Sequence, residues 1–302
     1  MISTRTPGAT APFPQEFLNK LETLRLEARR RYIGARKGSH LSPRRGTSLE
    51  FDDFRVYAPG DDPRWVDWGL YARTGRLYVK VFQEEEDLYV YVYVDASASM
   101  AVSGTDPTYR AATELALALS YVILSSEDSV RLHRLSAPDP QSTPFYRGRR
   151  RLLEAQEFLG RAAPRGRVRL PAALAPSLRA IRRPGKAILI SDLLFPLEEL
   201  RAGLDLLRAA NLDVLVIHIL GADELSPPLG GPERLVDSET GEEIDVRLDE
   251  SARAIYVANL ERHRREVKSL CHRFAVQYAF FDASTDLQDF VLTGLPALGL
   301  FR

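Results

Sequence analysis

Hydrophobic positions from residue 88 onward fall into short apolar runs separated by longer amphipathic stretches. The run Tyr89-Val-Tyr-Val-Tyr-Val94 is apolar or amphipathic on both faces, as is typical of a central strand covered by helices on each side. Strands are predicted at 89–94, 128–136, 186–192 and 213–220. Helices are predicted between them at 107–124, 150–160, 171–182 and 197–210. This alternation predicts an α/β fold with a doubly wound, mostly parallel sheet.

The C-terminal part of the chain predicts a hairpin followed by a closing unit. Leu235 to Val246 places polar turn residues between two strand-like runs. A highly charged helix from Asp249 to Arg273 and a strand from Phe274 to Phe281 follow. Thr285-Asp-Leu-Gln288 then has the pattern of a capping box, which predicts a last helix.

The N-terminal part has a different composition and predicts a separate subdomain. Its first residues are small, polar and Pro-bearing, which predicts a disordered tail. Apolar residues from Phe17 to Tyr32 recur at helical spacing, and Gly34 is a natural helix stop. The expected organisation is a tail at 1–13, an N-terminal helix with a small β subdomain at 14–87, and the α/β domain at 88–302.

Charged and aromatic residues are densely mixed between residues 49 and 87. Asp62 followed by Pro63 predicts a capped short helix after the Pro59-Gly60 turn, and Gly75 opens a strand that runs to about Phe82. Partly buried charges at this density need partners. The block therefore predicts ion pairs and aromatic packing in preference to a catalytic cluster. The basic segment before it, residues 36–46, is predicted to be a solvated loop.

Composition limits the classes of function that fit this fold. The 302 residues are 45% hydrophobic, which is enough to bury a sizeable core, and 41 basic residues balance 41 acidic ones. This balance gives no reason to expect nucleic acid or an anionic membrane as the main partner. One cysteine excludes an internal disulfide framework, and neither a membrane span nor a signal sequence is recognisable. We expect a cytoplasmic protein.

Oxygen-bearing side chains follow two of the predicted strands. Asp95, Ser97 and Ser99 come at spacing two after the first strand, and Asp192 ends a later one. Ligands of parallel sheets bind beyond the carboxyl ends of strands, where the strand order reverses, so these groups converge if the two strands are neighbours. A carboxylate and two hydroxyls are hard oxygen ligands suited to Mg²⁺.

Other reactive residue types fit packing roles better than chemistry. Cys271 and His272 are adjacent on a predicted helix and therefore do not face each other, so we expect Cys271 to be a packing residue. His218 lies in an apolar strand, which is typical of a core histidine with its polar atoms satisfied.

Two motifs carry a resemblance to known families. Asp95-Ala-Ser-Ala-Ser99, with Asp192 on a later strand, resembles the metal-ion-dependent adhesion site of von Willebrand factor A domains. The block from Ser48 to Trp68, with Ala72-Arg-Thr-Gly75 and Val79-Lys80, resembles the signature of the bacterial family catalogued as domain of unknown function 58, or DUF58. In that family the signature precedes an A-like domain, so the resemblance covers nearly the whole chain.

The resemblance implies an interaction module and no enzymatic activity. It implies as partners a MoxR-type AAA+ ATPase and a client protein complex that the two assemble, activate or supply with a metal cofactor. It also implies a cation held by Asp95, Ser97, Ser99 and Asp192, with an open position for a carboxylate of the partner protein.

One ligand of the A-domain pattern is missing. Its threonine corresponds to Val168, which has no oxygen, and Arg167 and Arg169 flank that position. A guanidinium repels a dication and pairs with carboxylates, so two alternatives remain open: a Mg²⁺ site, or a polar cluster with an arginine in place of the cation. Either arrangement could dock a carboxylate of the partner.

Two further classes of function stay as alternatives. One is a metal-dependent hydrolase of phosphoryl substrates that uses Asp95, which ranks low because no general base stands beside Asp95 in the motif and Ser97 and Ser99 lack a histidine partner. The other is a nucleic-acid-binding protein that uses the basic runs Arg36–Arg45 and Arg147–Arg151, which lack interleaved aromatic residues.

Overall fold

The computed structural model describes most of the chain, in two compact units. The described residues are 13–26, 49–84, 88–101, 108–161, 164–228, 232–236, 243–247 and 249–301. One unit contains residues 1–30 and 88–302, and the other contains residues 31–87. The predicted tail up to residue 12, the helix stop at Gly34, the basic segment 36–46 and the first residue of the helix predicted at 107–124 lie outside the described residues.

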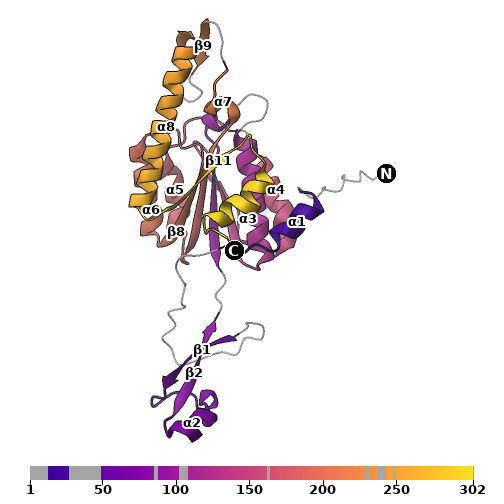
Figure 1. Cartoon of the computed structure of the whole chain (residues 1–302), viewed down its shortest axis with the longest axis vertical. Helices are drawn as coiled ribbons and strands as arrows, with labels where there is room; N and C mark the ends of the chain where they lie inside the picture. The colour runs from indigo at the N-terminus through magenta and orange to yellow at the C-terminus, as the bar shows by residue number, and fades with distance from the viewer. Residues whose placement is uncertain are drawn as a thin grey trace, which may run out of the picture. The chain divides into compact units, whose positions relative to one another are not determined.

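The first unit is built on a mixed, mostly parallel sheet (Figure 1). Its strands are β11 (Gln277–Asp282), β8 (Leu212–Leu220), β7 (Gly185–Ser191), β3 (Tyr89–Asp95), β4 (Ser129–Leu135) and β5 (Gln141–Ser142), in this spatial order. The first five are parallel, and β5 and β6 (Tyr146–Arg147) pair antiparallel with β4. The predicted doubly wound sheet is confirmed, and the two short antiparallel strands were not predicted.

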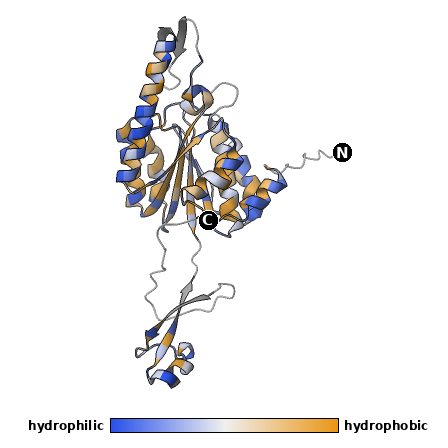
Figure 2. Cartoon of the chain, viewed as in Figure 1, coloured by the Kyte–Doolittle hydropathy of each residue, from blue (hydrophilic) through white to orange (hydrophobic). Residues whose placement is uncertain are grey.

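The alternation of valine and tyrosine in β3 separates two hydrophobic cores, one on each face of the sheet. Val90, Val92 and Val94 pack in the core that includes α3 (Thr108–Ser125) and α4 (Leu152–Gly160). Tyr91 and Tyr93 pack in the core that includes α5 (Leu170–Arg179), α6 (Leu197–Ala209) and α8 (Glu250–Arg273). Figure 2 shows the central strands as hydrophobic and the helices with polar outer faces, as a sheet buried on both sides requires.

Several other elements of this unit are short. They are the 3₁₀ turns at Ala98–Ala101 and Arg149–Arg151, α7 (Ala222–Leu225), and the antiparallel pair β9 (Pro232–Val236) and β10 (Glu243–Arg247). The long helix begins where it was predicted, and the Asp249 carboxylate caps it by accepting a hydrogen bond from the amide of Ala252 at 2.9 Å. In the part of the chain that the structure describes, no helix is long and apolar enough to cross a membrane.

The N-terminal helix is shorter than predicted and lies with the sheet unit. Helix α1 (Gln15–Leu21) buries Phe17, Leu18 and Leu21 in the core that contains α3. The chain then leaves the helix, Leu24 stays buried, and Leu26 forms a bridge with Phe301. These tertiary contacts override the helical spacing beyond Leu21. The expected grouping of this helix with the β subdomain therefore differs from the contacts observed.

The last helix starts differently from the predicted capping box. The Asp286 carboxylate accepts a hydrogen bond from the Gln288 amide at 3.0 Å and caps α9 (Leu287–Asp289). The Thr285 hydroxyl instead donates to the Asp282 carbonyl at 2.7 Å, and Thr285 precedes the capping residue. A π-turn at Phe290–Gly294 and α10 (Leu295–Ala297) follow.

The second unit is a small two-stranded subdomain. Strands β1 (Leu49–Val56) and β2 (Tyr78–Glu84) are antiparallel, and the 3₁₀ turn Pro63–Trp65 and α2 (Trp68–Thr74) connect them. The predicted cap is confirmed, since the Asp62 carboxylate accepts from the Arg64 amide at 3.0 Å. Ion pairs join Arg55 to Asp61 and Lys80 to Asp67, at 2.5 and 3.1 Å. These pairs agree with the predicted structural role of the charged block.

The contact of α6 with α5 depends on a glycine. A Cβ on Gly203 would lie 2.6 Å from Cδ2 and 2.8 Å from Cγ of Leu170, which is 1% exposed and cannot move away freely. Alanine is the better helix former by roughly 1 kcal/mol, but overpacking a core costs about 1–3 kcal/mol. We expect Gly203→Ala to lower the free energy of unfolding by about 1–2 kcal/mol in urea denaturation.

Gly160 offers a matched control for this substitution. It also lies in a helix, and a Cβ there meets no atom within 4 Å. Gly160→Ala should leave stability unchanged or raise it slightly, and an equal loss in both variants would show that the contact with Leu170 is not the cause.

Candidate functional site

The site occupies the point where the order of the parallel strands reverses. From β3 the chain passes to β4 on one side, and the next long parallel strand, β7, lies on the other side of β3. Asp95 ends β3, and Asp192 directly follows β7. The neighbouring strands that the sequence required are therefore present, and both carboxylates lie at the switch point where ligands of doubly wound sheets bind.

The carboxylate of Asp95 is buried and held on both oxygens. Its Oδ1 accepts a hydrogen bond from the Ser97 amide at 2.9 Å, and its Oδ2 accepts one from the Ser191 hydroxyl at 2.7 Å. The hydroxyl oxygens of Ser97 and Ser99 are 2.9 Å apart. Burial raises the pKa of Asp95 above its ordinary value, and the hydrogen bonds from Ser191 and Ser97 act in the opposite direction. The predicted group Asp95, Ser97 and Ser99 is thus assembled in one loop.

The carboxylate of Asp192 is less well satisfied. Its Oδ1 accepts a hydrogen bond from the Leu194 amide at 3.2 Å, whereas its buried Oδ2 has no hydrogen-bond partner among the described residues. Burial, followed by the charge of Asp95, raises the pKa of Asp192 to about 8. Two carboxylates that are each 1% exposed therefore influence each other, and one of them needs a proton or a cation near neutral pH.

This arrangement fits a hard divalent cation. The donor set consists of two carboxylates and two hydroxyls, and all of its donors are oxygens. The described residues contain no group of three or more His, Cys, Asp and Glu side chains placed to hold a metal, so hydroxyls and water would complete the coordination. Oδ2 of Asp192 has no hydrogen-bond partner in the ranges that the structure describes, so its lone pairs are those that a cation would use.

The second loop lies beside the first, but Val168 supplies no ligand. The Ala98 amide donates to the Gly166 carbonyl at 2.9 Å, and the Arg165 amide donates to the Ala96 carbonyl at 3.0 Å. Val168 is 3% exposed and packs in the core on the tyrosine face of the sheet. A water molecule would have to fill the coordination position that a threonine hydroxyl would take.

The two arginines of the second loop have an acidic partner of their own. Arg167 lies 3.9 Å and Arg169 lies 3.7 Å from the carboxylate of Glu199 on α6, and both side chains are about half or more exposed. These ion pairs direct both guanidinium groups to α6.

Three supporting contacts were missed from the sequence. The Ser191 hydroxyl donates a hydrogen bond to Asp95 and accepts one from the Leu193 amide at 3.0 Å. The sequence offered one signal for this contact, a serine directly before Asp192. On α8, Nε2 of His263 lies 2.8 Å from the carbonyl of Leu193, a residue with a φ of +54°. Because the histidine is distant in sequence from the strand it supports, no local pattern reveals this contact.

The third contact involves a buried glutamate near the site. Glu224 Oε2 accepts hydrogen bonds from the Thr108 hydroxyl and the Gly221 amide, both at 2.6 Å. Its charge also contributes to the raised pKa of Asp192. Glu224 therefore connects the start of α3 with the end of β8 and adds negative potential at the same edge of the sheet.

The other reactive residues occupy the core. His218 in β8 is buried, and its Nδ1 lies 3.0 Å from the Tyr278 hydroxyl, while Nε2 has no hydrogen-bond partner within the described ranges. The prediction that both ring nitrogens of His218 have hydrogen-bond partners therefore holds for Nδ1 but not for Nε2 among the described residues. Burial lowers the pKa of His218 to about 3, so the ring is neutral. Cys271 is fully buried, and burial raises its pKa to about 12, which agrees with the predicted packing role.

Comparison with known sequences identifies relatives over most of the chain. The model of the family described as "Protein of unknown function DUF58" matches residues 53–266, which span both units. An uncharacterized protein of Mycobacterium bovis is 31% identical over 255 residues, or 82% of this chain and 78% of the relative. Uncharacterized proteins of two Mycobacterium tuberculosis strains match to the same extent.

Solved structures show weaker similarity. The conserved hypothetical protein BatB from Bacteroides thetaiotaomicron has a TM-score of 0.42 and 17% identity, over 70% of this chain and 98% of that one. An aerotolerance-related membrane protein from Bacteroides fragilis has a TM-score of 0.46 and 16% identity, over 70% and 97%. The SpRpn10 VWA domain has a TM-score of 0.40 and 12% identity, over 68% and 94%.

Proposed function

The chain belongs to the DUF58 family, and we propose that it is a protein-interaction adaptor, not an enzyme, with a cation-dependent docking site formed by Asp95, Ser97, Ser99 and Asp192. The observation that carries this proposal is the buried Oδ2 of Asp192, which lacks a hydrogen-bond partner in the described part of the chain and lies at the switch point of the sheet. A site of this kind suits a ligand that brings its own charge.

The protein's own residues would hold Mg²⁺ from one side. Asp95 and Asp192 supply charge, and Ser97 and Ser99 supply neutral oxygens, so a bound dication would keep positive charge for a carboxylate of a partner. Ser191 and His263 are positioning residues, because they hold Asp95 and the loop after Asp192 respectively.

The partner we propose is a MoxR-type AAA+ ATPase, with a client protein complex as the second partner and the cytoplasm as the location. This proposal rests on the family membership and on the resemblance of the site to those of A domains. Nucleic-acid binding by the basic run at 147–151 is less favoured, because acidic side chains already pair with two of its arginines. Arg149 pairs with Glu22 at 2.7 Å, and Arg151 pairs with Glu154.

A co-purification experiment with the MoxR-type ATPase of the same genome tests this function. The wild-type chain should retain the ATPase in Mg²⁺ and release it in EDTA, and Asp95→Ala should fail to retain it under both conditions. Asp205→Ala, a change of an exposed carboxylate on α6, is the matched control and should behave as the wild type. Retention that neither EDTA nor Asp95→Ala alters would contradict docking at this site.

A further inference from the structure

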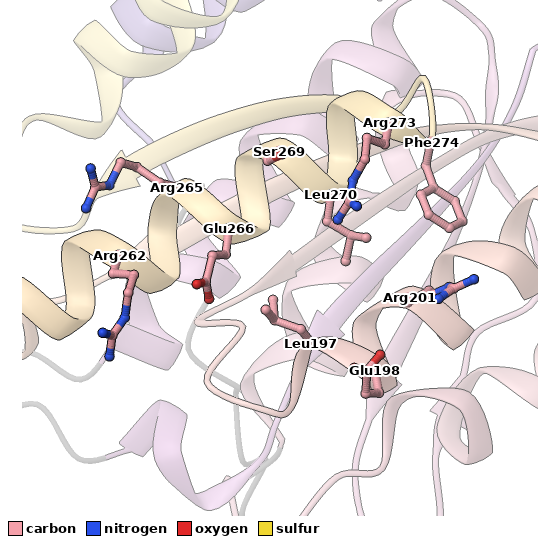
Figure 3. A pocket seen from close by; sticks show the side chains of 10 residues that line it. All are labelled: Leu197, Glu198, Arg201, Arg262, Arg265, Glu266, Ser269, Leu270, Arg273 and Phe274. Atoms are coloured by element: carbon pink, nitrogen blue, oxygen red, sulfur yellow. The ribbon is translucent and has the colours of Figure 1, made fainter.

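A second surface of the sheet unit, outside the Asp95 site, has the features of a docking groove. It lies between α6 and α8 and has a volume of about 750 Å³ (Figure 3). Its apolar part comes from Leu197, Leu270 and Phe274, whose side chains point toward the space between the two helices in Figure 3. This volume is within the range of pockets that bind ligands.

The rim of the groove is rich in arginine. Arg201 stands on α6, and Arg262, Arg265 and Arg273 stand on α8. Arg265 follows Arg262 by 3 residues, and Arg273 follows Arg265 by 8 and Arg262 by 11. At helical spacing these three arginines lie along one side of α8. All four are exposed, and none of them forms an ion pair within the described residues.

These arginines contrast with the other basic residues nearby. Arg264 on α8 pairs with Glu261, and Arg167 and Arg169 pair with Glu199. Arg208 also lies over the Phe274 ring, 5.7 Å from its centroid, and so adds positive charge beside the apolar floor. The groove therefore combines unneutralised positive charge with an apolar surface.

We propose that this groove receives an acidic, amphipathic segment of a partner protein. Carboxylates of the segment would meet the guanidinium groups of the rim, and its apolar side chains would cover the half-buried Leu197 and Phe274. Two glutamates, Glu198 and Glu266, also line the groove. They oppose a continuous phosphate backbone, whereas a peptide can place a neutral or basic residue at those points.

Fluorescence anisotropy with a designed probe tests the proposal. The probe is a labelled peptide of about 15 residues with glutamates and a leucine stripe at helical spacing. The wild-type chain should bind it, and the double charge reversal Arg265→Glu with Arg273→Glu should weaken binding at least about tenfold. The matched control reverses Arg179 and Arg182, which are exposed and lie outside the groove, and should change affinity less than about twofold.

Cross-linking places the probe on the structure. Ser269 is exposed in the groove, so Ser269→Cys labelled with a benzophenone should cross-link to the acidic peptide. Cys271 is buried, and its raised pKa keeps it unreactive, so the label enters only at position 269. Asp95→Ala should leave both results unchanged, which separates this groove from the function proposed above.

Several outcomes would overturn the proposal. These are a wild-type chain that does not bind the acidic peptide, a control reversal that weakens binding as much as the groove reversal, and a peptide that fails to cross-link. Tighter binding of single-stranded RNA or phosphatidylglycerol vesicles, lost in the groove reversal, would instead assign the surface to phosphate groups.

Discussion

In EDTA at pH 8.5, Asp192→Asn is expected to be more stable than the wild type by about 2–4 kcal/mol, and at pH 5.5 the gain should be much smaller. Asparagine keeps the shape of the side chain but carries no charge at either pH. The wild-type carboxylate must ionise at the higher pH while it is 1% exposed, with one oxygen lacking a hydrogen-bond partner in the described structure.

The direction in which stability changes with pH follows from the pKa of Asp192. Its value of about 8 in the folded state is above the ordinary value of 3.8, so between these limits the folded chain binds more protons than the unfolded chain. The stabilising contribution is complete below about pH 4 and is lost as the pH rises through about 8. Each pH unit in this window corresponds to about 1.4 kcal/mol for one group, and relaxation of the site reduces the total.

Urea denaturation of the wild type and of Asp192→Asn at pH 8.5 and pH 5.5 measures this difference in stability. Asp205→Asn, on the exposed face of α6, is the control and should match the wild type at both pH values. Mg²⁺ at pH 8.5 should stabilise the wild type and leave Asp192→Asn unchanged. A difference between the two chains that does not vary with pH would show that Asp192 is ionised, or accessible to water, throughout.

Lys186→Ala is expected to lower the free energy of unfolding by about 3–5 kcal/mol. Lys186 has no exposed surface, its Nζ lies 3.3 Å from Oδ2 of Asp213, and it donates to Oε1 of Gln277 at 2.7 Å. These contacts join β7, β8 and β11 at the end of the sheet opposite the Asp95 site. Removal of the lysine takes away the ammonium group that lies 3.3 Å from this nearly buried carboxylate.

A pair of variants separates the charge from the lost volume. Lys186→Met keeps most of the side-chain volume, and Lys186→Met combined with Asp213→Leu removes both charges. Urea denaturation should show the double variant to be more stable than Lys186→Met alone, although it carries one more substitution. Lys268→Ala, at an exposed position of α8, should cost less than about 0.5 kcal/mol. A double variant less stable than the single one would refute the argument from the lost ion pair.

The fold was predictable where a local pattern coincides with burial. Alternating Val and Tyr in β3 marked a strand covered on both faces, and the highly charged stretch from Asp249 to Arg273 marked α8. The helix predicted from Phe17 ends at Leu21, because the contact of Leu26 with Phe301 is set by the opposite end of the chain. The cap at Asp286 was missed by one residue because the Thr285 hydroxyl bonds backward to Asp282.

The candidate site was predictable in part for the same reason. Asp95, Ser97, Ser99 and Asp192 could be placed together because parallel strands bring their carboxyl ends to one edge of the sheet. The support of that edge by His263 and Glu224 depends on helices that pack across the sheet, and neither spacing nor composition encodes it.

The claim that Asp95 and Asp192 hold a cation for a partner is tested most directly by calorimetric titration of the wild-type chain with Mg²⁺ at pH 7. Two buffers with different ionisation enthalpies report the protons released. We predict one binding event that releases about one proton, because Asp192 keeps its proton at this pH until the ion binds. Asp95→Ala and Asp192→Asn should show no binding. Absence of binding to the wild type at millimolar Mg²⁺, or equal binding to Asp95→Ala, would contradict the claim.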